Sequence, residues 1–182
     1  MTKQHHTPIT GRPNIKTAMN TVLGALDAAI GTIGEFDTAL VMKRTTNGDG
    51  GSTSNATWNA RQITADFQDD GNIISQASGT TFTPIAGRYL MMNWSGILDS
   101  DKNRMRLYNV TQNSVVGYGG SSDAGDLYGM IPMFLEFTAN GTDVYRVDHY
   151  TETAKATTGM GQQDGQSPPD IHMQALIIRL GS

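Results

Sequence analysis

Residues 80–98 constrain the fold more than any other part of this chain; they read TTFTPIAGRYLMMNWSGIL. Pro84 cannot donate a backbone hydrogen bond, so it belongs at a strand end or edge, and Gly87 permits a sharp turn. The residues from Arg88 to Trp94 are typical of a strand, but they show no regular alternation of apolar and polar side chains. Such a run indicates cover on both faces. We therefore expect a sandwich core on one face and a partner subunit on the other.

The rest of residues 38–182 has the pattern of short strands joined by many turns. Glycine is frequent, with 21 residues in 182, and no helical periodicity follows residue 36. Asn140-Gly141 is a strong hairpin signal between two strands, and residues 171–180 form a strong final strand. We count roughly eight to ten strands at hairpin spacing, which predicts an all-β antiparallel jelly-roll sandwich over residues 38–182.

Residues 1–37 differ from the rest and predict a polar arm followed by a short coiled-coil-like helix. Pro13 is suited to the first turn of this helix, and apolar residues then recur with heptad spacing. The helix could pack on its own domain, but the narrow seam and its three glycines favour a bundle of several chains. We therefore expect residues 1–37 to anchor and trimerise the protein, with seam residues Ile15, Met19, Val22, Leu26 and Ile33.

A family resemblance rests on Phe82, Gly87, Tyr89 and the following Leu90 or Met91. Their spacing resembles the F-x-x-P-x-x-G-x-Y-x-[FL] signature of tumour-necrosis-factor-like and complement-head-like jelly rolls. Residues 143–147 and 173–180 are similar to the last two strands of that family. The resemblance implies a homotrimer with side chains lining a threefold axis, and it places Tyr89, Tyr145 and Leu176 there. The alternative for Tyr89 is an ordinary core tyrosine.

The sequence contains no motif for catalysis, so we expect a non-enzymatic protein without a cofactor, catalytic residue or metal site. It has no cysteine, no G-x-S-x-G and no H-E-x-x-H. Residues 47–51 and 99–103 resemble parts of calcium loops, but turns are the better interpretation because the expected closing acid or glycine is absent. A net charge of −4 without a block of like charge predicts no nucleic-acid partner. No run approaches the roughly 20 apolar residues of a membrane span, so we expect no membrane insertion.

The resemblance, together with a short arm and no signal segment after Met1, implies a virion protein of a tailed bacteriophage, made in the host cytoplasm. We expect a homotrimeric capsid decoration (cement) protein or head fibre whose residues 1–36 bind the major capsid protein. One alternative is the receptor-binding tip of a tail fibre, with loops at residues 117–129 and 157–169 contacting a host surface receptor. Another is a carbohydrate-binding module.

Overall fold

The computed structural model describes residues 20–21, 23, 37–45, 48–64, 68–69, 71–123, 128–163 and 170–181, without the side chains of residues 76–78. The chain divides into two units, Met1–Phe36 and Asp37–Ser182. In the first unit Asn20, Thr21 and Leu23 are helical. The predicted seam residues lie outside the described residues: Ile15, Met19, Val22, Leu26 and Ile33. No helix within the described part of the chain has the length and apolar character to span a membrane.

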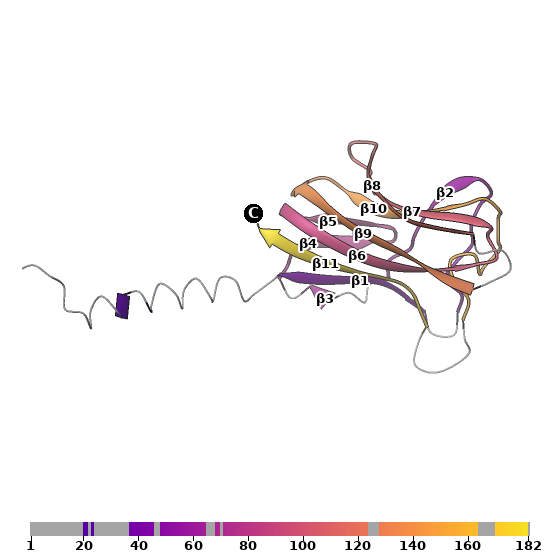
Figure 1. Cartoon of the computed structure of the whole chain (residues 1–182), viewed down its shortest axis with the longest axis horizontal. Helices are drawn as coiled ribbons and strands as arrows, with labels where there is room; N and C mark the ends of the chain where they lie inside the picture. Colours follow the sequence, from indigo (N-terminus) through magenta and orange to yellow (C-terminus); the bar gives the residue numbers. More distant parts are fainter. Residues whose placement is uncertain are drawn as a thin grey trace, which may run out of the picture. The chain divides into compact units, whose positions relative to one another are not determined.

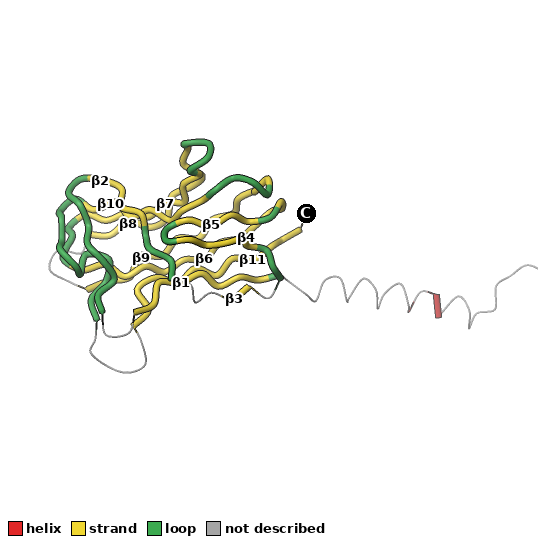
Figure 2. Tube along the Cα trace, turned by 180° about the vertical axis from the view of Figure 1, so that it is seen from behind, coloured by secondary structure: helices red, strands yellow, loops and turns green. Residues whose placement is uncertain are grey.

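The second unit is a sandwich of two antiparallel sheets (Figure 1). One, the β11 sheet, has the strand order β3-β1-β11-β6-β9, and the other, the β10 sheet, has the order β4-β5-β10-β7-β8, with β2 also paired to β10. The strands are β1 (Thr38–Thr45), β2 (Thr57–Ala60), β3 (Gln68–Asp69), β4 (Ile74–Ser78), β5 (Thr81–Pro84), β6 (Ala86–Leu98), β7 (Lys102–Asn109), β8 (Ser114–Asp123), β9 (Tyr128–Asn140), β10 (Tyr145–Thr151) and β11 (Asp170–Gly181). The two layers are also visible from behind (Figure 2), and they confirm the all-β prediction.

The central strand β6 has a core face and an outward face, although its sequence shows no regular alternation. Tyr89 and Met91 point into the sandwich and are fully buried, whereas Leu90 and Met92 lie half-buried on the other face. Trp94 on the outward face is 36% exposed. Both faces are apolar, so polarity does not reveal the period of two, but the pleat imposes it.

Two predicted axis-facing residues are in fact core residues. Tyr89 is 0% exposed and Tyr145 is 2% exposed within a single chain, so neither can contact a neighbouring subunit. The ring of Tyr89 stacks on Phe137 with centroids 5.3 Å apart, and its hydroxyl donates to the Ile85 carbonyl over 2.8 Å. The prediction of an axis role is therefore wrong for both tyrosines, and the core alternative stated for Tyr89 is correct.

The connections agree with the sequence in some places and differ in others. Asn140 and Gly141 do begin a turn after β9, where Gly141 has φ +88° and the Asn140 Oδ1 accepts from the backbone of Thr142 and Asp143. The predicted hairpin is wrong, however, because β9 pairs with β6 in one sheet and β10 pairs with β7 in the other, so this turn connects the two sheets. The prediction of a loop over residues 117–129 is wrong, because β8 continues to Asp123 and β9 begins at Tyr128. Residues 157–160 form turns and residues 161–163 have no regular secondary structure, and the rest of the second expected loop lies outside the described residues.

Candidate assembly face and polar interior

The outward face of the β11 sheet is apolar across four neighbouring strands. Its central row consists of Leu40, Leu176, Met92 and Phe134, which lie directly opposite one another on β1, β11, β6 and β9. The flanking rows add further apolar side chains. We call the set the apolar face: Leu40, Met42, Leu90, Met92, Trp94, Pro132, Phe134, Leu176 and Ile178.

The apolar face has the features of a protein–protein interface. Phe134 is 55% exposed, and its ring meets Trp94 edge-on with centroids 5.4 Å apart. Beside this pair lies a hollow of about 520 Å³, which is lined by Thr38, Leu40, Gln68, Trp94, Gln174 and Leu176. An ion pair between Arg88 and Glu136, with an N–O distance of 2.5 Å, lies at the rim. A contiguous apolar patch with a polar rim is typical of an interaction site.

Of the three predicted interface residues within the described part of the chain, one lies on this face. Leu176 lies half-buried in the central row, next to Met92 and Leu40. Sequence analysis missed Met92 and Phe134 as surface residues. Met92 and Phe134 alternate along their strands with residues that face the core. This spacing alone does not show which set of residues is buried, because that depends on the cross-strand register, which a single strand does not specify.

Part of the interior between the sheets is polar. Arg61 follows β2 and is 2% exposed. Its Nη2 donates to the carbonyls of Gly96 on β6 and His172 on β11, over 2.9 Å and 2.8 Å, so this side chain links the two sheets. Its Nη1 has no hydrogen-bond partner among the described residues. Burial lowers the pKa of Arg61 to about 9, so the guanidinium remains charged at neutral pH.

His149 on β10 is the second buried ionisable group of this interior. Its Nε2 lies 2.7 Å from the Oδ1 of Asn103, whose Nδ2 donates to the Asp101 carbonyl. Because that oxygen is the acceptor, Nε2 carries the proton, and Nδ1 has no partner in the part of the chain that the structure describes. Burial, and secondly the charge of Arg61, lowers the pKa of His149 well below its usual value. His149 is therefore neutral at pH 7.

Acidification is expected to destabilise the protein through His149. The unfolded chain takes up a proton at this residue near pH 6.5, whereas the folded chain resists it. The contribution of neutral His149 to the free energy of unfolding is therefore fully present above about pH 6.5. Below about pH 6.5 the free energy of unfolding decreases by up to ~1.4 kcal/mol for each pH unit. Urea unfolding at about pH 7.5, 6.5 and 5.5 measures this slope. The His149→Gln variant should lack it, and an equal slope in that variant would show that another group is responsible.

The fold and the apolar face together define a two-sheet antiparallel jelly roll with one outward face suited to association. Among solved structures, murine APRIL at pH 8.5 is similar with a TM-score of 0.53 and 11% identity, covering 80% of this chain and 100% of that one. Murine APRIL at pH 5.0 gives a TM-score of 0.54 with 10% identity and the same coverage. The globular domain of zebrafish complement 1qA gives a TM-score of 0.49 with 12% identity, covering 80% of this chain and 98% of that one. No family model and no curated protein matches the sequence. The likeness to APRIL confirms the predicted jelly-roll fold.

Proposed function

We propose that this chain is a non-enzymatic structural protein that acts as a homotrimer, assembled through the apolar face. The observation that carries the proposal is the row of Leu40, Leu176, Met92 and Phe134 on the outside of the β11 sheet. Fully burying an exposed apolar side chain such as Phe134 contributes about 1.5–3 kcal/mol. The half-buried Leu40, Leu176 and Met92 contribute less each, and their sum has to exceed the entropy cost of association. The threefold symmetry is supported by the resemblance to tumour-necrosis-factor-like and complement-head-like jelly rolls.

The geometry favours a contact between unlike parts of the same face. Strand β9 is the edge of the β11 sheet and carries the exposed ring of Phe134. The hollow beside Trp94 and Leu176 extends from the inner strands of that sheet to Gln68 on β3, its opposite edge. We expect the β9 edge of one subunit to pack over the hollow of the next. Such head-to-tail contacts close into a ring when the rotation between subunits is right.

The particular role we propose is capsid decoration, or a head fibre, in a tailed bacteriophage, with residues 1–36 binding the major capsid protein in the virion. Two observations support it. The chain divides into Met1–Phe36 and Asp37–Ser182, as expected for an anchor and a knob. Residues 1–12 are polar and lack the side chains of a core, so they suit extended contacts with another surface. Three such arms on one trimer act together, which strengthens weak contacts by avidity.

Deleting residues 1–36 is expected to separate attachment from assembly. The shortened chain should remain folded and trimeric, because the apolar face lies entirely within residues 37–182. It should no longer co-sediment with assembled capsids. Light scattering measures the oligomeric state, and co-sedimentation measures binding to capsids. A monomeric shortened chain would place the trimer contacts in the helix, and full capsid binding by it would exclude the arm as the anchor.

A second candidate function is the receptor-binding tip of a tail fibre or a carbohydrate-binding module. The observation that favours it is a set of arginine and aromatic side chains on the outward face of the β10 sheet. Binding of the purified protein to host cells would support the receptor role.

A further inference from the structure

The outward face of the β10 sheet carries a ladder of guanidinium groups and aromatic rings. Alternate residues of β7 point outward there, while Met105 and Leu107 between them are buried in the core. The ladder joins residues of four strands, and we call it the arginine–aromatic face: Trp58, Arg104, Arg106, Tyr108, Tyr118 and Arg146.

The rings hold the guanidinium groups at fixed positions. The guanidinium carbon of Arg104 lies 4.1 Å from the centroid of the Tyr118 ring. That of Arg106 lies between two rings, 4.2 Å from Trp58 and 4.3 Å from Tyr108. Stacking of this kind is worth about 0.5–1 kcal/mol at exposed sites and more where water is excluded. The cations are therefore pre-organised, and little side-chain entropy remains to be lost on binding an anion.

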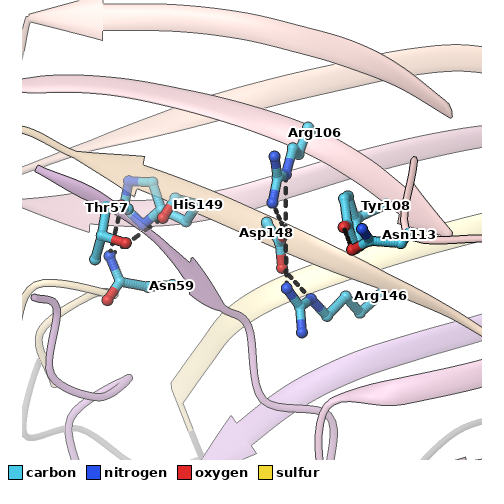
Figure 3. Close-up of polar contacts among 8 residues, drawn as sticks. All are labelled: Thr57, Asn59, Arg106, Tyr108, Asn113, Arg146, Asp148 and His149. Atoms are coloured by element: carbon cyan, nitrogen blue, oxygen red, sulfur yellow. Dashed lines mark hydrogen bonds and ion pairs between the residues drawn. The ribbon is translucent and has the colours of Figure 1, made fainter. Parts of the chain in front are cut away.

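The buried carboxylate of Asp148 neutralises part of the positive charge of these arginines (Figure 3). Asp148 is 0% exposed and accepts from the Nε of Arg106 over 2.8 Å and from the Nε of Arg146 over 2.6 Å. Three guanidinium groups and one carboxylate leave a formal charge of +2 on this face, although the whole chain carries −4. Arg104 has no carboxylate partner within the described residues.

A polar hollow adjoins Arg104. It has a volume of about 280 Å³ and is lined by Lys102, Asn103, Ser121, Ser122 and Asp123 at the ends of β7 and β8. Arg104 lies directly opposite Ser121 in the strand register, so the cation and the hollow form one continuous surface. The neighbouring ion pair between Lys102 and Glu152, at 2.9 Å, adds no net charge, and the Asp123 carboxylate in the lining adds one negative charge. An unpaired guanidinium, a 48% exposed tyrosine ring and the hydroxyls of Ser121 and Ser122 therefore meet at one place.

We propose that this surface binds an acidic oligosaccharide through one carboxylated sugar residue. Arg104 would receive the carboxylate, since a guanidinium matches a carboxylate in charge and shape. The exposed part of Tyr118 offers a surface for the C–H groups of the sugar, and the hollow offers partners for its hydroxyls. A long polyanion is disfavoured because the whole chain is negative beyond this face. This inference goes beyond the structural role proposed above, and each subunit would bind on its own.

Titration calorimetry of the full chain tests the proposal. The carboxylated probes are sialyllactose and trigalacturonate, with lactose as the neutral control and oligodeoxythymidylate as the polyanion. We expect at least one carboxylated probe to bind about tenfold or more tightly than lactose. Arg104→Gln and Tyr118→Ala should each weaken that binding by about tenfold, and Tyr118→Phe should retain it. Arg88→Gln, which removes the same charge from the opposite sheet, is the matched control and should change it less than about twofold.

Several results would overturn the proposal. The first is that neither carboxylated probe binds at millimolar concentration. The second is that Arg104→Gln and Arg88→Gln weaken sugar binding equally. The third is that oligodeoxythymidylate binds more tightly than the sugars, which would indicate a nucleic-acid surface. Thermal melting of each variant verifies folding, and both Arg104 and Tyr118 are exposed enough to be replaced without disturbing the core. Light scattering reports the trimer separately. A monomer that binds the sugar would refute the homotrimer but not this site.

Discussion

Replacing Leu176 by glutamate is expected to separate the proposed homotrimer into single chains without unfolding the jelly roll. Leu176 lies in the middle of the apolar face, between Leu40 and Met92, and lines its hollow. A carboxylate at this position would be buried in the assembled trimer without a cation to pair with, which costs several kcal/mol. Each 1.4 kcal/mol is a factor of ten in a dissociation constant, so we expect the subunits to dissociate at least about 100-fold more readily.

The fold should survive this change, because the Leu176 side chain points away from the core. Its neighbours Ala175 and Ile177 point inward and are fully buried. Light scattering on the purified protein should therefore report one 19.6 kDa chain instead of three, with an unchanged melting temperature for the isolated domain. Val116→Glu adds the same charge at a 36% exposed position of the opposite sheet and is the matched control. A Leu176→Glu protein that stays trimeric would exclude the apolar face as the interface.

The sequence predicted the architecture well because its signals for strands and turns are local. A turn at Asn140-Gly141 follows from the conformations that these residues prefer, although the strands on either side belong to different sheets and do not form the predicted hairpin. The final strand follows from its continuous apolar run. The long strand around Tyr89 was also predicted correctly as a strand that is apolar on both faces. What the run could not reveal is which residues face inward, since a shift of one residue exchanges the two faces. Tyr89 and Tyr145 were therefore assigned to an interface although they fill the core.

The polar interior and the arginine–aromatic face depend on contacts between distant parts of the chain. Arg61 is separated by more than a hundred residues from His172, to whose carbonyl it donates. A lone arginine after a short strand is normally exposed to solvent, and nothing near it in the sequence indicates a buried bridge between sheets. In the same way, Trp58 and Arg106 meet only because β2 and β7 both pair with β10. Such sites require the strand order, which the sequence alone does not specify.

The second large effect is expected from replacing Asp148 by alanine. This fully buried carboxylate joins Arg106 on β7 to Arg146 on its own strand, and the two arginine side chains are only 12% and 31% exposed. Removing it leaves two closely spaced cations that are partly shielded from water. Breaking a fully buried ion pair costs about 3–5 kcal/mol, and the partial exposure of the arginines reduces our expectation to about 2–4 kcal/mol.

Urea unfolding at neutral pH measures this loss of stability. Asp123→Ala, at an exposed position of β8, is the matched control and should change the free energy of unfolding by no more than about 0.5 kcal/mol. Asp148→Asn keeps one oxygen acceptor for the arginines and should lie between the two. A loss below about 1 kcal/mol for Asp148→Ala would mean that ring stacking alone positions Arg106 and Arg146. In that case the carboxylate would serve mainly to lower the charge of the face, and its removal should strengthen the binding of a carboxylated sugar.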